Sequence, residues 1–356
     1  MGTTTDAGGN FTLSYVKPGK YDLVISFVGF EPYHQPIVVG GTVQNLGNME
    51  LHAKSIVLRE VRVGEANNVT WQRNYQWFKE SLLGTNSLAK TCKIVNPDVL
   101  DLIYHAKTDS LTATADDFLL IENNALGYRI KYLIAYFFRC DSGRRVSYKG
   151  YPLFEKLKGT PAQEARWVKN RRKAYEGSSV HFLRAGIANR LDDEGFRVFQ
   201  YAIYANPHRP ADSLIRAKIT QFSARVKLGK GRLKDSLTYW KAEQERPAIL
   251  HQLLNFPLAA TEFIKRTSQA GTYALTCDHD GLYIIFSKAH HFPKNGAIDL
   301  LNSPYNNNST LLNFNTWLAL FDTNGWFIDP DSVMLTGVWT QNRTAGLLPI
   351  DYDPTE

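Results

Sequence analysis

The 356-residue chain has few cysteines, no long apolar run and no internal repeat. Its three cysteines, Cys92, Cys140 and Cys277, lie far apart and form no C-x-x-C pair, which argues against a zinc ribbon or a disulfide framework. Buried thiols are expected, and one disulfide stays open as the alternative, between partners that the sequence does not select. No stretch of about 18 uncharged apolar residues occurs, so no helix is expected to span a membrane.

The chain also lacks the short motifs of the common enzyme classes. A zinc carboxypeptidase needs H-x-x-E and a distant histidine, so that three ligands leave one position on the metal open. No histidine here is followed three residues later by glutamate, and H-E-x-x-H, G-x-S-x-G, the P-loop and the Rossmann glycine pattern are all missing. We therefore assign no catalytic residue, and we expect no metal site and no cofactor.

The composition is that of a globular protein. Hydrophobic residues make up 44% of the chain and aromatic residues 12%, which excludes disordered and collagen-like classes and allows a substantial core. The length predicts two or three domains. Lysine and arginine outnumber aspartate and glutamate by 41 to 34, so the formal net charge is +7 and anionic partners are slightly favoured.

The N-terminal region has the pattern of β-strands joined by tight turns. The run Asp6-Ala-Gly-Gly-Asn10 supplies residues that tolerate positive φ, as a hairpin loop requires, and Pro18-Gly19 favours a second turn. Hydrophobic residues at every second position of 21–27 predict a strand with one buried face. Two further apolar runs, at 36–39 and 57–63, are expected to add strands.

Three motifs carry a family resemblance in this region. They are T-x-D-x-x-G-N-F from Thr4 to Phe11, P-G-x-Y-x-L from Pro18 to Leu23, and S-x-x-G-F from Ser26 to Phe30. They resemble the carboxypeptidase regulatory-like (transthyretin-like) domain, a β-sandwich common at the N-terminus of Bacteroidota cell-envelope proteins. Because members usually open with two more strands, the resemblance implies a truncated β-sandwich at residues 1–66 with a natural start further upstream. The resemblance implies a fold and export to the envelope, but it does not imply an enzymatic activity.

An α+β body, mainly antiparallel, is expected over residues 67–356. Helices are predicted near 70–83, 161–176 and 179–191, where apolar residues recur at helical spacing. Strands separated by turn residues are predicted at 99–104, 110–115, 118–122, 127–140 and 145–149. Further along, the sequence predicts short helices at 236–244 and 249–254, and strands at 273–276, 282–287, 316–321 and 332–339.

The body carries a second resemblance. Runs such as Tyr148-Lys-Gly-Tyr-Pro-Leu-Phe154 and Leu347-Leu-Pro-Ile-Asp-Tyr-Asp-Pro354 look like those of an uncharacterised group of Bacteroidota proteins that carry the same N-terminal domain. The resemblance extends over nearly the whole chain, but the group has no agreed activity. It therefore implies a place in the envelope and no mechanism.

The predicted helix at 161–176 separates a cationic face from an apolar one. At 100° per residue, Arg166, Lys169 and Lys173 fall within about 60° of one another. The opposite side carries Trp167, Val168, Ala174 and Tyr175. Arg171 falls inside the apolar arc, where an unpaired guanidinium is costly, so it should bind a carboxylate or a carbonyl. The three outer cations are either a solvated face or an anion-binding site for lipid headgroups or lipopolysaccharide.

Two weaker groups of polar residues have metal-binding chemistry. His279 lies in the run Cys277-Asp-His-Asp-Gly281, and hairpin geometry could bring it near His290-His291. A second group offers oxygens to calcium without the spacing of a calcium loop, and consists of Asp322, Asn324, Asp329 and Asp331. Both groups are equally typical of plain turns, which is the interpretation that we adopt.

These features predict a non-catalytic protein of the periplasm or outer membrane. The N-terminal domain would act as a docking or spacing module, and the body would bind an envelope protein, a glycan, anionic lipid or lipopolysaccharide. Nucleic acid is not expected as a partner, because no RNA- or DNA-binding signature occurs. The alternative is a hydrolase of envelope glycan or peptide with an unrecognised active site, and a concave pocket that gathers two or more carboxylates or histidines would favour it.

Overall fold

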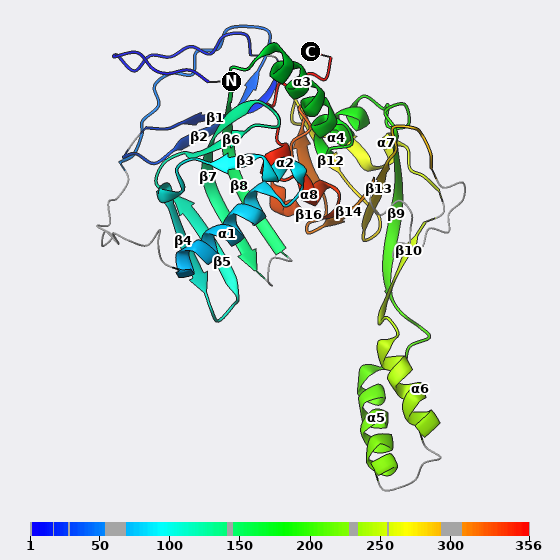
Figure 1. The fold of residues 1–356 in the computed structure, drawn as a ribbon. Helices are drawn as coiled ribbons and strands as arrows, with labels where there is room; N and C mark the ends of the chain where they lie inside the picture. Colours follow the sequence, from blue (N-terminus) through cyan, green and yellow to red (C-terminus); the bar gives the residue numbers. More distant parts are fainter. Residues whose placement is uncertain are drawn as a thin grey trace.

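The computed structural model describes residues 2–16, 18–27, 29–53, 69–140, 145–227, 234–254, 256–292 and 308–355. Every strand pair among them is antiparallel. An N-terminal β region is followed by a mixed body of helices and sheets, drawn from blue to red in Figure 1. This arrangement confirms the predicted α+β, mainly antiparallel fold class.

The N-terminal region contains a two-stranded sheet. Strand β1 (Gly19–Ile25) pairs with β2 (Tyr33–Val39), which includes the predicted run at 36–39. Leu23 is the buried residue of β1, whereas Phe27 lies beyond the end of the strand and is 64% exposed. The prediction of a buried face that continues through Phe27 was therefore wrong. The strand predicted at 57–63 lies outside the described residues.

The predicted hairpin loop near the N-terminus is a tight turn held by one aspartate. The carboxylate of Asp6 accepts hydrogen bonds from the backbone N–H groups of Gly8 at 2.9 Å and Asn10 at 2.8 Å. Gly9 has φ +80, which a residue with a Cβ rarely adopts. Residues on both sides of this turn carry no regular strand within the described part of the chain.

The first lobe of the body, residues 69–156, is a six-stranded sheet with one long helix, α1 (Val69–Leu83), packed against it (Figure 1). Helix α2 is Ser87–Lys90. The strands are β3 (Cys92–Ile94), β4 (Leu100–His105), β5 (Ser110–Ala115), β6 (Leu119–Asn123), β7 (Tyr128–Cys140) and β8 (Arg145–Lys156). Strand β7 is long enough to pair with β5, β6 and β8.

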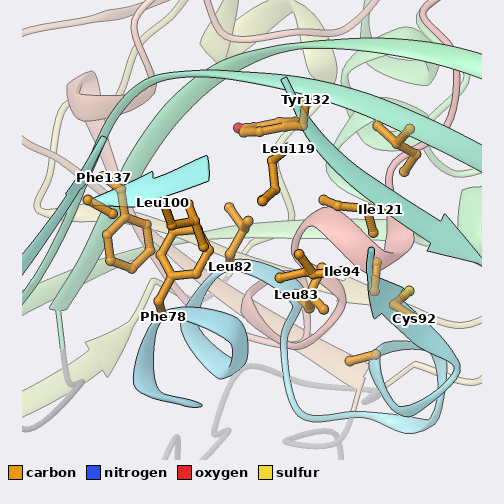
Figure 2. Packing of buried hydrophobic residues seen from close by; sticks show 14 of the residues in the cluster. Phe78, Leu82, Leu83, Cys92, Ile94, Leu100, Leu119, Ile121, Tyr132 and Phe137 are labelled. Carbon is orange, nitrogen blue, oxygen red and sulfur yellow. The ribbon is translucent and has the colours of Figure 1, made fainter. Parts of the chain in front are cut away.

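Apolar burial fixes α1 on this sheet. Phe78, Leu82 and Leu83 are almost fully buried, and they point toward Ile121 of β6 and Phe137 of β7 in Figure 2. The rings of Phe78 and Phe137 lie 4.8 Å apart in a tilted arrangement. Because aromatic and leucine side chains bury large apolar areas, this cluster supplies most of the hydrophobic stabilisation of the lobe.

The second lobe, residues 161–355, contains two sheets and two well-packed helices. The helices are α3 (Pro161–Tyr175) and α4 (Ser179–Ile187). The five-stranded sheet has the order β10 (Ile249–Leu253), β9 (Phe196–Ala205), β13 (Gly281–Phe286), β14 (Ser309–Phe314) and β16 (Val333–Gly337). The smaller sheet has the order β11 (Ile264–Arg266), β12 (Thr272–Leu275) and β15 (Ala319–Asp322). Phe182 of α4 lies at the centre of the core. Short helices α7 (Ala260–Phe263) and α8 (Trp339–Asn342) complete the lobe.

A helical arm extends from the second lobe. Helices α5 (Asp212–Lys227) and α6 (Lys234–Glu245) pack on each other between strands β9 and β10 and project away from both lobes (Figure 1). The prediction of a helix at 236–244 is confirmed, and α5 was not predicted. The predicted helix at 249–254 was wrong, because this apolar segment pairs with β9 as strand β10.

The C-terminal segment ties the two lobes together. Asn123 of the first lobe donates a buried hydrogen bond of 2.8 Å to the carbonyl of Ala345, and Arg343 donates to the carbonyl of Ser81. Asp331 accepts hydrogen bonds from Tyr136 and from a neighbouring serine of β8. Among the described helices, none is both long and apolar enough to cross a membrane.

Candidate functional site

Helix α3 carries the predicted anion-binding residues, and its ends are set by local sequence. The hydroxyl of Thr160 accepts from the N–H of Gln163, and the Gln163 side chain accepts from the N–H of Thr160, which forms a capping box. Pro161 occupies the first turn, where its missing N–H costs nothing. Gly177 has φ +76 just after the helix. The prediction of a helix at 161–176 is confirmed to within one residue.

Helix α4 ends at Ile187, sooner than the predicted 191, because the chain turns at Asn189 with φ 53.

The inner face of α3 is anchored on the turn between β6 and β7. The indole N–H of Trp167 donates to the carbonyl of Asn124 at 2.9 Å. A Cβ placed on Gly127, which has φ +70, would lie 2.2 Å from the Trp167 ring. Only glycine satisfies both the backbone conformation and the close approach of the indole. The amide of Asn170 adds a hydrogen bond of 2.8 Å to the carbonyl of Ala125.

Arg171 lies on this inner face and binds backbone carbonyls, as predicted. Its Nε donates to the carbonyl of Leu126 at 2.7 Å and its Nη2 to that of Gly127 at 3.4 Å. The guanidinium also lies 4.1 Å from the ring centroid of Tyr128, in cation–π contact. Val168, which was expected on the apolar side, is 45% exposed because it lies at the edge of that arc, so this assignment was wrong.

The outer face of α3, defined as Arg166, Lys169 and Lys173, is solvent-exposed. Within the described ranges, no carboxylate forms a salt bridge with any of the three. The nearby Glu176 is instead occupied by Arg172 at 3.5 Å and by Lys288 at 2.5 Å. The outer face therefore presents three positive charges on a helix whose opposite side is fixed.

A pocket of about 420 Å³, the aromatic pocket, lies between the C-terminal end of α3, the start of α4 and the C-terminal segment. Its aromatic lining consists of Tyr148, Tyr175, Phe196, Phe286, Trp326, Trp339 and Tyr352. Its charged lining consists of Lys173, Glu176, Arg184 and Arg343. The volume falls within the range of about 300–1,000 Å³ that is usual for small-molecule sites.

A much larger cleft, about 3220 Å³, separates the N-terminal sheet from the body. Residues of β1, β2 and β8 line it, together with parts of the segment 325–351. Strand β8 pairs with β7 alone among the described strands, so its other edge faces this cleft. The sequence did not predict the cleft, because its walls come from segments far apart in the chain.

Three titratable side chains come together in the cleft. The ring of His34 on β2 lies 5.9 Å from that of Tyr151 on β8. Burial is the main cause that raises the pKa of Tyr151 above its ordinary value, and the negative charge of Asp22 on β1 adds to it. Asp22 and His34 project from the same face of the N-terminal sheet, because Asp22 pairs with Pro36 and side chains two residues apart share a face.

In the second candidate metal group, two aspartates accept hydrogen bonds from backbone N–H groups, Asp322 at the end of β15 and Asp329 at the start of a short 3-10 helix. The carboxylate of Asp322 accepts from the N–H groups of Asn324 and Trp326 at 2.9 and 3.0 Å. Asp329 accepts from the N–H of Asp331 at 3.1 Å. In the described ranges, no group of three or more histidines, cysteines and carboxylates is arranged to hold a metal ion.

No disulfide joins the three cysteines. Cys92 and Cys140 are buried, as predicted, whereas Cys277 is half-buried. Burial raises the pKa of the Cys92 thiol to about 12, so this group stays protonated and unreactive at neutral pH.

Comparison with known proteins identifies one part of the chain. Residues 1–63 match the family model described as a CarboxypepD_reg-like domain, which confirms the resemblance seen in the N-terminal motifs. No family is assigned to the rest of the chain, and neither a curated protein nor a solved structure matches the sequence. The resemblance of the body to an uncharacterised envelope group stays a prediction.

Proposed function

We propose, taking the CarboxypepD_reg-like domain at residues 1–63 as the premise, that this chain is a non-catalytic binding protein of the cell envelope. The body would attach to an anionic envelope surface through the outer face of α3, and the N-terminal domain would help to dock a partner. The observation that carries the proposal is the set of three exposed cations on that face, none of them paired with a carboxylate among the described residues.

In such an attachment, the electrostatic free energies of the individual cations add, and salt screens them. A lysine or arginine close to an anionic membrane contributes about 1 kcal/mol, and the effect falls off within a Debye length of about 8–10 Å. The inner face of α3 is held by the hydrogen bonds of Trp167 and Arg171, so the backbone that carries the outer cations is fixed. The lysine and arginine side chains lose rotamer freedom when they bind headgroup phosphates, which offsets part of the attraction.

The cleft supports a macromolecular partner for the N-terminal domain. Its volume of about 3220 Å³ is several times that of a metabolite site, so it suits a polypeptide or a glycan chain better than a small molecule. The outer edge of β8 offers backbone N–H and C=O groups to an extended polypeptide, which is how β-strand addition works. We infer that an envelope protein or glycan occupies the cleft.

Two measurements test this proposal. Fractionation of cells that make the protein should recover it in the periplasm or with the outer membrane, and recovery in the cytosol would remove the basis for an envelope role. The purified protein should also sediment with vesicles of phosphatidylcholine and phosphatidylglycerol at low salt, but not with phosphatidylcholine alone. Equal binding to both vesicle types would contradict the electrostatic attachment.

A hydrolase of envelope glycan or peptide is the second candidate, and one observation favours it. Asp22, His34 and Tyr151 bring a carboxylate, an imidazole and a phenol to one place in the cleft, which are the groups that general acid–base catalysis uses. Hydrolysis of peptidoglycan fragments or peptides by the parent protein, lost in Tyr151→Phe, would support the enzyme. An equal rate of hydrolysis in Tyr151→Phe would show that the activity does not depend on this tyrosine.

A further inference from the structure

The aromatic pocket collects positive charge that the protein itself does not neutralise. Of its four charged lining residues, Lys173, Arg184 and Arg343 are cationic, and Glu176 is the lone carboxylate. Glu176 already binds Arg172 and Lys288. The pocket is therefore cationic, and seven aromatic residues share its lining with these charges.

Arg343 is the most confined of these cations. Its Nε donates to the carbonyl of Thr340 at 3.0 Å and its Nη1 to that of Ser81, and both acceptors are neutral. Among the described residues, no carboxylate lies within salt-bridge distance of it. Burial is the main cause that lowers the pKa of Arg343; Tyr148 opposes this shift, and the neighbouring charge of Arg139 adds to it. A half-buried guanidinium without a counterion carries a desolvation cost, and a bound anion would relieve that cost.

Arg184 of helix α4 is a second pocket cation whose donors bind neutral acceptors. It donates to three backbone carbonyls, those of Asn324, Ile350 and Tyr352, at 2.7 to 2.8 Å. The charge of Arg184 reaches the carboxylate of Asp322, but the two groups form no salt bridge. The positive end of helix α4, at Ser179 and Val180, also lines the pocket and adds to the favourable potential for an anion.

The uncharged residues that line the pocket suit a ligand with a flat ring better than an inorganic ion. Trp326, Trp339 and Tyr352 line the pocket with aromatic rings, and Asn308 and Asn342 add side-chain amides, of which the Asn342 Oδ1 already accepts from Asn86. Sugar rings bind well to this combination, because their C–H faces pack on aromatic rings while their hydroxyls exchange hydrogen bonds with amides. Inorganic phosphate alone would leave most of the aromatic surface without contact.

We propose that the aromatic pocket is a binding site for a small anionic sugar, one that carries a carboxylate or a phosphate group. The anionic group would lie between Arg343, Arg184 and Lys173, and the ring would pack against the aromatic walls. This site is separate from the outer face of α3 except at Lys173, which belongs to both.

The test is isothermal titration of the full chain with three probes: glucuronate, glucose 6-phosphate and uncharged glucose. At least one anionic probe should bind, and glucose should bind at least tenfold more weakly. The comparison of glucuronate with glucose 6-phosphate identifies which anionic group the site prefers. Absence of binding by both anionic probes at millimolar concentration, or binding of glucose equal to theirs, would overturn the proposal.

Two matched variants locate the binding site. Lys173→Gln should weaken binding of the anionic probe about tenfold, the loss expected for one charge-assisted hydrogen bond. Lys241→Gln removes the same charge from helix α6, which contributes no residue to the pocket lining, and should bind the probe like the parent. Both lysines are exposed, so neither change should prevent folding. Equal affinities in the two variants would place the ligand elsewhere and overturn the assignment.

Discussion

Lys169 and Arg171 lie two residues apart on α3, yet their positive charges have opposite surroundings. Arg171 points inward, where two backbone carbonyls and the ring of Tyr128 surround its guanidinium. Lys169 points outward and forms no salt bridge within the described part of the chain. The inward cation contributes to folding because its removal leaves the buried carbonyl of Leu126 without the guanidinium donor. The outward cation contributes little to folding and is free to bind another molecule.

The largest expected effect is on the inner face. Trp167→Ala removes an indole that packs on Gly127 and Gly159 and donates to Asn124, so it should destabilise the protein by about 3–5 kcal/mol. Urea unfolding of variant and parent measures this difference. Val168→Ala is the control, because that side chain is 45% exposed and its truncation should cost less than about 1 kcal/mol. Similar losses in the two variants would contradict the assigned faces.

Gly127→Ala tests the same contact from the other side. The new Cβ would lie 2.2 Å from the Trp167 ring at a backbone φ of +70, so strain and overpacking together should cost about 2–4 kcal/mol. Gly271→Ala separates the two causes, because its φ is +71 while the nearest atom to the new Cβ is 3.7 Å away. Thermal or urea unfolding of both should rank Gly127→Ala as clearly less stable. Equal stabilities would mean that the Trp167 ring moves away from the new Cβ without lowering the free energy of unfolding.

Arg171→Ala should cost about 1–3 kcal/mol, because the carbonyl of Leu126 loses its guanidinium donor and that of Gly127 keeps only the N–H of Leu157. Arg166→Ala removes an identical side chain from the outer face and should stay within about 0.5 kcal/mol of the parent. Arg171→Lys should recover only part of the loss, since an ammonium cannot reproduce the planar two-donor contact. Equal losses of stability in Arg171→Ala and Arg166→Ala would contradict the claim that the inner face of α3 stabilises the fold and the outer face does not.

A smaller effect should follow pH through His181, whose ring contacts the pocket residues Tyr175, Phe196 and Phe286. Its Nδ1 accepts from the N–H of Gly177 at 3.1 Å, and its Nε2 faces Glu194 at 3.2 Å, an arrangement that suits the neutral ring. Burial is the main cause that lowers the pKa of His181 below its ordinary value of 6.5, against the opposing charges of Glu194 and Glu176. The unfolded chain therefore takes up this proton first as the pH falls.

The contribution of His181 to stability should be complete above about pH 6.5 and should decline as the pH falls toward its lowered folded-state pKa. Urea unfolding at pH 7.5 and pH 5.5 measures the decline in the parent. His181→Gln, which lacks the titrating group, should show a smaller difference between the two pH values. An unchanged difference would assign the acid sensitivity to other residues.

The sequence predicted local features well, because their causes are local. Thr160 and Pro161 begin α3 through capping, and the helical spacing places Arg171 inside and Lys169 outside. Helical spacing does not decide whether Val168 is buried, because this residue lies at the edge of the apolar face of α3. The burial of such a residue depends on how closely the neighbouring segment packs against the helix. Ile249–Leu253 was misread for a similar reason: a short apolar run fits a helix or a strand, and its pairing with β9 decides.

The candidate sites were harder to predict, because their walls come from distant parts of the chain. The aromatic pocket joins Tyr148 of the first lobe, Arg184 of α4 and Arg343 near the C-terminus. The cleft similarly joins His34 to Tyr151. No periodicity or spacing links such residues in a single sequence. Lys173 is the exception, because the helical phase of α3 predicted its cationic face without indicating the pocket beside it.

The most direct test of the account compares vesicle binding by two triple variants of equal charge. One changes Arg166, Lys169 and Lys173 to Gln, and the other changes Arg225, Lys227 and Lys241 of the helical arm to Gln, so each lowers the formal net charge from +7 by three. At low salt, the α3 variant should lose roughly a hundredfold in affinity for phosphatidylglycerol vesicles, at about 1 kcal/mol for each cation, with a weaker salt dependence. The arm variant should bind like the parent. Parent-like binding by the α3 variant, or an equal loss in both, would contradict an anion-binding role for the outer face.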